Sequence, residues 1–293
     1  MQYALGVTLS VVIITYNEEA NIARTLESVM PLVRDGKGEI IVVDSGSTDR
    51  TVEIARSFGA KVFVEEWKGF AAQKNSALEK ASSEWVLSLD ADEEVESALR
   101  DEILQLMSLG SGEQLQKLSK GGDDAWVKRK EELIVIYEDQ REGPLAGAEI
   151  ARKNCFLGRW IRHGGFFPDR KLRLFSRGSA SFENRKVHED PKTDGFTVYL
   201  QGALLHRSYP SLSDYIEHMN RYSSLGAEMA VDKGHRGFSL VNIVLRPWAT
   251  FVYNYFFRLG FLDGREGLLL HLYHAVYVSW KYAKAWELGR KKR

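Results

Sequence analysis

Four short apolar runs dominate the first 100 residues, and each one ends in polar residues. They are "LSVVIIT" (9–15), "GEIIVVD" (38–44), "AKVFVEE" (60–66) and "EWVLSLD" (84–90). The segments between them carry the apolar spacing and capping signals of helices. Strands that alternate with helices predict an α/β domain with a mostly parallel central sheet flanked by helices. Because the runs are continuously apolar, helices should cover both faces of that sheet.

The polar residues after these strands mark the place where a ligand would bind. In an open parallel sheet, ligands bind beyond the carboxyl ends of the strands. The residues found there are Thr15, Tyr16 and Glu18 after the first run, Asp44 after the second, and Asp90 and Asp92 after the fourth. We expect them to share one edge. Neither G-x-G-x-x-G after the first strand nor G-x-x-x-x-G-K-[ST] anywhere is present, so dinucleotide and P-loop sites lack support.

The stretch "VLSLDADEEV" (86–95) places four carboxylates directly after an apolar run. Asp90 and Asp92 are two residues apart, so they face the same side if the strand geometry continues. Two such carboxylates repel each other unless a cation lies between them, and Mg²⁺ or Mn²⁺ prefers oxygen ligands and bridges to diphosphates. The pair therefore predicts a metal site. The alternative is an acidic helix start, which is the interpretation preferred for Glu93 and Glu94.

Charge is distributed unevenly although the net charge is zero. Residues 1–100 hold 10 Lys/Arg against 17 Asp/Glu, whereas residues 141–293 hold 25 against 14. The basic part suggests contact with phosphate groups or an anionic membrane, with a solvated surface as the alternative. No nucleic-acid-binding signature accompanies this charge. The single cysteine, Cys155, fits a reducing compartment, and the first apolar run lacks the basic flank of a signal peptide.

Two later segments depart from the strand–helix alternation. Residues 110–143 are polar and glycine-rich and are interpreted as an insertion, either a helical excursion or a mobile loop. From about residue 150, Arg, Gly and aromatic residues suit irregular site-forming loops more than a second sheet domain. We predict a catalytic domain over 1–205 and amphipathic helices over 206–293. Aromatic residues interleaved with basic ones suit helices in a membrane interface, and packing on the sheet domain is the alternative.

Three stretches taken together resemble a known family. "SVVIITYNEEANIARTLESV", "EIIVVDSGSTDRTVEIA" and "LSLDADEEV" occur in the order seen in family 2 glycosyltransferases, which have the GT-A fold. "NCFLGRWIRHGGFFPDRKLRLFSRG", "VHED" and the closing aromatic stretch resemble the WaaE/KdtX-type branch. That branch is associated with glucosyl transfer to the lipopolysaccharide inner core. The resemblance covers nearly the whole chain except about 110–143.

The resemblance implies an inverting, metal-dependent hexosyltransferase that uses Mg²⁺ or Mn²⁺. Its donor would be UDP-glucose, and its acceptor a lipid-anchored saccharide, with the heptose of the inner core expected. The implied positions are Thr15, Tyr16 and Glu18 at the base and ribose, Asp44 at the base, Lys74 at the sugar or diphosphate, and Asp90 and Asp92 at the diphosphate and metal. Glu189 of "VHED" would be the catalytic base, with Asp190 as the alternative.

A dense basic cluster between residues 159 and 173 completes the expected site. Arg suits bidentate phosphate contacts, so Arg162 and Arg173 are predicted to bind the donor diphosphate or the anionic groups of the acceptor. The alternative is a solvated basic loop. We expect a cytoplasmic protein that is peripheral on the inner face of the cytoplasmic membrane. Other functions left open are transfer to polyprenyl phosphate or another envelope glycan, and a non-catalytic nucleotide-sugar-binding scaffold.

Overall fold

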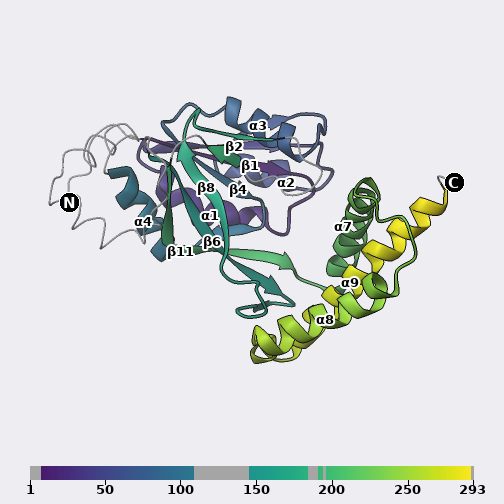
Figure 1. The fold of residues 1–293 in the computed structure, drawn as a ribbon. Helices are drawn as coiled ribbons and strands as arrows, with labels where there is room; N and C mark the ends of the chain where they lie inside the picture. The colour runs from purple at the N-terminus through teal and green to yellow at the C-terminus, as the bar shows by residue number, and fades with distance from the viewer. Residues whose placement is uncertain (1–7, 109–144, 184–190, 194–195, 292–293) are drawn as a thin grey trace. The chain divides into compact units, whose positions relative to one another are not determined.

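The computed structural model describes residues 8–108, 145–183, 191–193 and 196–291 (Figure 1). The chain forms two compact units, which are described separately. The first consists of Met1–Arg152 and Arg170–His206, and the second of Lys153–Asp169 and Arg207–Arg293.

The first unit contains the parallel strands expected from the apolar runs. The strands are β1 (Leu9–Thr15), β2 (Gly38–Asp44), β3 (Lys61–Val64) and β4 (Trp85–Asp90), in the spatial order β3-β2-β1-β4. The helices between them are α1 (Ile22–Val33), α2 (Thr51–Ser57) and α3 (Phe70–Glu79). All three neighbouring strand pairs are parallel. The predicted strand–helix alternation is therefore confirmed.

Helices cover both faces of this parallel part, and alternate residues of β1, β2 and β4 supply the two core clusters, whereas β3 is mostly exposed. Val11 and Ile13 of β1 pack in a cluster that includes residues of α1 and of α4 (Ser97–Ser108). Val12 packs on the opposite side in a cluster that includes Ala77 of α3. Figure 1 shows α3 and α1 on opposite sides of the sheet. Burial of both faces explains why these strands are continuously apolar in sequence.

The same sheet continues beyond β4 with strands that the sequence did not predict. They follow in the order β8 (Asp169–Ser176), β6 (Leu145–Phe156), β11 (Phe196–Tyr209) and β5 (Glu93–Val95), with β7 (Arg159–Trp160) paired to β6. β4 pairs with β8, and β11 with β5, in antiparallel fashion. The sheet is therefore mixed. β9 (Ala180–Phe182) and β10 (Pro191–Thr193) form a separate antiparallel pair.

The expectation of irregular loops from about residue 150 is therefore wrong for most of that region. These residues do not need a core of their own, because they extend a sheet that the first 100 residues have already built. In β8, the polar residues Arg170, Lys171 and Arg173 stand beside the apolar Leu172 and Leu174. This mixture hides the strand pattern from a reading based on hydrophobicity. The interpretation of 110–143 as an insertion lies outside the described residues.

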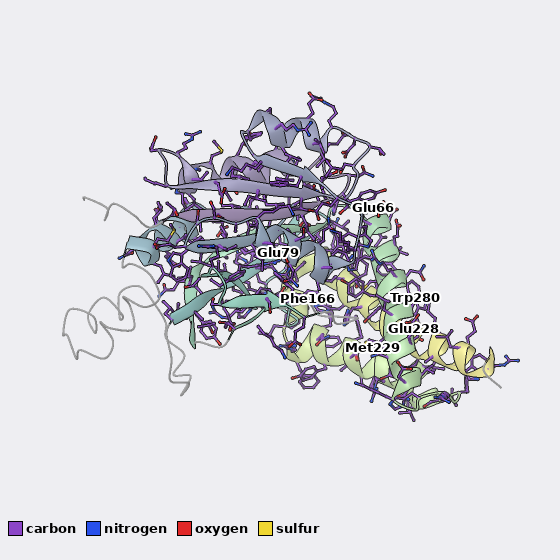
Figure 2. The ribbon with its side chains drawn as sticks, turned by 90° about the horizontal axis from the view of Figure 1, so that it is seen from above. Glu66, Glu79, Phe166, Glu228, Met229 and Trp280 are labelled. Atoms are coloured by element: carbon purple, nitrogen blue, oxygen red, sulfur yellow. The ribbon has the colours of Figure 1, made fainter. Side chains whose placement is uncertain are left out.

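The second unit contains the C-terminal helices that the sequence predicted. They are α7 (Leu212–Asp232), the π-helical turn η1 (Val241–Leu245), α8 (Arg246–Val252), the π-helical turn η2 (Tyr253–Phe257), the 3-10 turn η3 (Gly260–Asp263) and α9 (Gly264–Lys291). A reciprocal pair of hydrogen bonds between Ser211 and Asp214 caps the start of α7. Small side chains, including Ala227 and Ala285, form a core between α7 and α9. Figure 2 labels Met229 and Trp280 on these two helices. Among the described helices, none combines the length and apolar content needed to cross a membrane.

Candidate functional site

The strand ends that the sequence singled out lie at one edge of the sheet. Thr15 is the register partner of Asp44, and Ile14 is the partner of Asp90. The carboxyl ends of β1, β2 and β4 therefore lie side by side, as expected for the ligand edge of a parallel sheet.

Asp44 organises the turn that follows β2. Its carboxylate is fully buried and accepts hydrogen bonds from Thr15 Oγ1 (3.0 Å), Gly46 N (2.9 Å), Ser47 N (2.8 Å) and Ser47 Oγ (2.5 Å). Four donors match the acceptor capacity of a carboxylate. The side chain thus serves as a cap for this turn. Contact with a nucleotide base, which stays a prediction, would require one of the two hydroxyl donors to rotate away.

The loop after β1 carries Tyr16 and Glu18, which differ in their surroundings. Tyr16 is exposed and available for stacking on a planar ligand. Glu18 accepts a hydrogen bond from Asn21 Nδ2 at 2.9 Å. Burial, with added repulsion from the carboxylates of Asp92 and Asp90, raises the pKa of Glu18 above its ordinary value. Because the carboxylates of Asp92 and Asp90 act on its pKa, Glu18 lies at the same edge of the sheet as these predicted metal ligands.

The carboxylate of Asp90 forms ion pairs with two basic side chains, Lys74 and Arg173. Lys74 Nζ lies 2.8 Å from Asp90 Oδ1, and Arg173 Nη2 lies 2.5 Å from Asp90 Oδ2. Arg173 also lies 2.6 Å from Glu93 Oε1. Burial opposes ionisation of Asp90, but Arg173 and Lys74 outweigh it and hold the pKa of Asp90 well below its usual range. Arg152 Nη1 completes the group, 4.0 Å from Asp90 Oδ2 and 3.4 Å from Glu93 Oε1. The result is a largely buried five-residue ion cluster at the end of β4.

Four separate elements supply the residues around Asp90. α3 supplies Lys74, β8 supplies Arg173, β5 supplies Glu93, and β6 supplies Arg152. The interpretation of Glu93 as an acidic helix start is wrong, because Glu93 is the first residue of β5 and its side chain is fully buried. A three-residue strand is too short to show an alternating pattern, so this role could not be predicted from the sequence. Arg173 was predicted as a phosphate ligand, and here it binds two carboxylates of its own chain.

Asp92 has a different partner, His206, which sequence reasoning missed. Antiparallel pairing of β5 with β11 sets Glu93 opposite His206, which brings Asp92 Oδ2 to 3.3 Å from His206 Nε2. Burial acts to lower the pKa of His206, but the carboxylates of Asp92 and Glu93 overcome that effect and raise it. The signal in the sequence was a histidine directly after the apolar run "GALL" (202–205).

Asp92 and His206 are the donors that fit a divalent cation at this edge. One carboxylate oxygen and one imidazole nitrogen suit Mn²⁺, which could take its other ligands from a diphosphate and water. Asp90 does not fit as a direct ligand while Lys74 and Arg173 occupy its oxygens. No group of three or more His, Cys, Asp or Glu side chains suited to a metal occurs among the described residues. The metal roles of Asp90 and Asp92 therefore stay predictions.

Arg162 belongs to the second unit, where it lines a cavity of about 430 Å³. Its guanidinium lies 4.2 Å from the centre of the Trp160 ring. The backbone amides of Arg162 and His163 donate to the buried carboxylate of Asp263 at 3.2 and 2.8 Å. Arg159, Trp160 and His163 also line this cavity, and its basic and aromatic side chains suit an anionic ligand. Glu189, together with its alternative Asp190, lies outside the described residues.

Comparisons with known proteins agree with these features. Residues 10–108 match the profile of Glycosyl transferase family 2. An uncharacterized glycosyltransferase of Rickettsia typhi is 30% identical over 287 residues, which cover 97% of this chain and 89% of the relative. The lipopolysaccharide core biosynthesis glycosyltransferase LpsC of Rhizobium meliloti is 28% identical, over 95% of this chain and 92% of LpsC.

A solved structure supports the fold over nearly the whole chain. The mannosyltransferase PcManGT of Pyrobaculum calidifontis, in complex with GDP-Man and Mn²⁺, aligns with a TM-score of 0.50. The alignment covers 97% of this chain and 90% of that one, at 14% sequence identity. At this identity the likeness concerns the fold alone, and it confirms the GT-A architecture with its C-terminal helices.

Proposed function

Because the chain belongs to glycosyltransferase family 2, we propose that it transfers a hexose from a nucleotide sugar to a lipid-anchored saccharide. We propose UDP-glucose as the donor and the heptose of the lipopolysaccharide inner core as the acceptor. The relative LpsC, which spans nearly the same length and is named for lipopolysaccharide core biosynthesis, supports this acceptor class. The proposed place of action is the inner face of the cytoplasmic membrane.

The observation that carries the proposal is the difference in surroundings between the carboxylates of Asp90 and Asp92. Asp90 is fixed by Lys74 and Arg173, whereas Asp92 faces the imidazole of His206. Asp92 and His206 would hold Mn²⁺ or Mg²⁺, which neutralises the developing charge on a leaving diphosphate. The Asp90 cluster would keep the turn between β4 and β5 in place, so that Asp92 is presented in a fixed position.

Inversion at the anomeric carbon requires a carboxylate near the acceptor hydroxyl, to remove its proton as the oxygen attacks. We propose Glu189 for this role, on the basis of the "VHED" resemblance. A Glu189→Gln variant should bind the donor normally but lose turnover by about 10²-fold or more. If Glu189→Gln is active and Asp190→Asn is not, the base is Asp190.

Calorimetric titration of UDP-glucose in the presence and absence of Mn²⁺ tests the donor and metal site. Wild type should bind more tightly with Mn²⁺, and Asp92→Asn should lose about tenfold or more of that metal-dependent affinity. Asp101→Asn, on the exposed surface of α4, is the matched control and should behave as wild type. Equal titrations for wild type and Asp92→Asn would contradict the role of Asp92.

Turnover separates the remaining alternatives. A donor screen with deacylated inner-core acceptor should yield a hexose-extended product, and linkage analysis should show a β-linkage from the α-linked donor. Transfer to a polyprenyl phosphate but not to the inner core would favour the other acceptor class. Donor binding without turnover on any acceptor would favour a non-catalytic binding protein.

A further inference from the structure

Exposed apolar side chains concentrate in one part of the second unit. Among the described residues, 20 large hydrophobic side chains are exposed, and 12 of them lie within residues 238–262. We call this segment the apolar segment; it includes Leu240, Leu245, Trp248, Phe256, Phe257 and Leu262. Trp248 is 65% exposed and Phe257 is 75% exposed. Exposed apolar side chains gathered in one segment in this way indicate an interaction site on a folded protein.

The opposite side of the apolar segment is already used for packing against α9. Ser279 of α9 donates a hydrogen bond to the carbonyl of Ile243 at 2.8 Å. The guanidinium of Arg246 bonds to the hydroxyl of Tyr282 and lies 5.2 Å from the centre of its ring. Pro247 is buried, whereas the π-helical turns η1 and η2 contain no buried residue. The exposed side chains therefore form the outer face of a helical layer whose inner face is fixed.

The charge of this region identifies its partner. The apolar segment contains Arg246 and Arg258 but no Asp or Glu, and Asp232, Lys233 and Arg236 precede it while Asp263 follows it. A second copy of the chain would bring these like charges together across a two-fold axis without acids from the segment to pair them. An anionic bilayer offers both an apolar interior and negative headgroups. Trp and Tyr side chains, present here as Trp248 and Tyr253, favour the boundary between the two.

We infer that the apolar segment is a docking surface for an anionic lipid bilayer, with its helices lying in the plane of the interface. Trp248, Phe257 and their apolar neighbours would enter the headgroup–acyl boundary, and the basic residues would meet lipid phosphates. The proposed binding is peripheral, and no described helix is suited to cross a membrane. The inference deepens the proposed function, and rests on it, in that the surface would bring the site to a lipid-anchored acceptor.

Vesicle flotation of the full chain tests this surface. The arms are phosphatidylcholine vesicles, the same vesicles containing phosphatidylglycerol, and a vesicle-free gradient. Wild type should float most with the anionic vesicles, and added salt should reduce its recovery. A Trp248→Ser/Phe257→Ser variant should lose about tenfold or more of its partitioning, because each large aromatic side chain contributes substantially when it leaves water.

A matched control comes from exposed aromatic residues of the first unit. Trp67 and Phe70 are 47% and 41% exposed, and Trp67→Ser/Phe70→Ser should float as wild type does. A circular dichroism melt of each variant shows whether the fold is retained. Wild type that does not float with anionic vesicles, or a Trp248→Ser/Phe257→Ser variant that floats equally well, would overturn the inference.

Light scattering distinguishes self-association from membrane docking. If the wild type forms a dimer that the Trp248→Ser/Phe257→Ser variant does not form, and neither floats, the partner is a second copy and the inference is overturned. Transfer by the wild type to a soluble deacylated acceptor, measured without vesicles, tests the proposed function separately. A protein that transfers sugar but does not float refutes only the docking surface.

Discussion

Arg173 is the residue on which the buried ion cluster depends most. Its side chain reaches both Asp90 and Glu93, and the residue is only 4% exposed. Lys74 contacts Asp90 but not Glu93, and Arg152 contacts both from farther away, at 4.0 and 3.4 Å. Paired buried charges contribute little net stability, but removing the nearest partner leaves the carboxylates poorly compensated in a medium that solvates them poorly.

Replacing Arg173 by Met should therefore lower the free energy of unfolding by up to about 3–5 kcal/mol, because Glu93 is left with the more distant Arg152. Lys74→Met should cost clearly less, because Asp90 keeps Arg173 as a partner. Urea unfolding of the two variants measures the difference. An Arg173→Met variant that is as stable as Lys74→Met would show that the cluster does not depend on Arg173.

His271 is a buried titratable residue with no role in the proposed chemistry. It packs so closely that a Cβ added at Gly164 would lie 1.9 Å from its ring. Burial and the nearby His274 lower the pKa of His271 to about 4, with Arg258 acting in the same direction and Asp263 opposing them. In the unfolded chain, the imidazole should titrate near its ordinary value of 6.5.

This difference in pKa predicts a loss of stability in mild acid. The unfolded chain binds the proton more readily, so the contribution of His271 is full above about pH 6.5 and falls as the pH drops toward 4. Between pH 7 and pH 5, the loss attributable to His271 is up to about 2 kcal/mol. Unfolding curves across this range should be less pH-dependent for His271→Leu. An identical slope in both proteins would contradict the assignment.

At the scale of elements, α3 links the site to the β9–β10 pair through two consecutive residues. Lys74 reaches Asp90, while the Asn75 amide donates to the carbonyl of Phe182 and accepts from its N–H, both at 2.9 Å. The side chain of Asn75 thus satisfies both backbone groups of Phe182, as a neighbouring strand would. This link holds the end of β9 against the helix that presents Lys74.

An Asn75→Ala variant should lose about 1–3 kcal/mol of stability, because both backbone groups of Phe182 lose their partner. Hydrogen exchange at the Phe182 amide should accelerate more than at amides in β1. Glu79→Ala, exposed on the same helix (Figure 2), is the control and should change neither quantity. Unchanged protection at Phe182 in Asn75→Ala would show that other contacts hold β9.

The strands also show which parts of the fold could be predicted from the sequence. β1, β2 and β4 were predictable because two covered faces make a strand continuously apolar. β6, β8 and β11 were not, because their polar and apolar residues are mixed. The positions of Asp90 and Asp92 beside the other strand ends followed from the parallel topology. Their partners did not, because Arg173 and His206 reach them through strand pairings made at separations of 83 residues and more.

At the scale of the whole molecule, each unit has a distinct proposed task. The first contains the strand ends, the ion cluster and the Asp92–His206 pair. The second contains the cationic cavity at Arg162 and the apolar segment. An exposed apolar surface costs solubility in water, and transfer to a lipid-anchored acceptor gives a reason for retaining it. The sequence resemblance indicated the family and the edge of the sheet at which the donor is expected to bind. The structure added His206 and the partners of Asp90.

The most direct test of the central claim is the mass of an acceptor saccharide incubated with the protein, UDP-glucose and Mn²⁺. Deacylated lipopolysaccharide inner core should gain one hexose with the wild type, and should gain none with Asp92→Asn under the same conditions. An acceptor that stays unmodified by wild type across a panel of nucleotide sugars, with either Mn²⁺ or Mg²⁺, would contradict the proposed transfer.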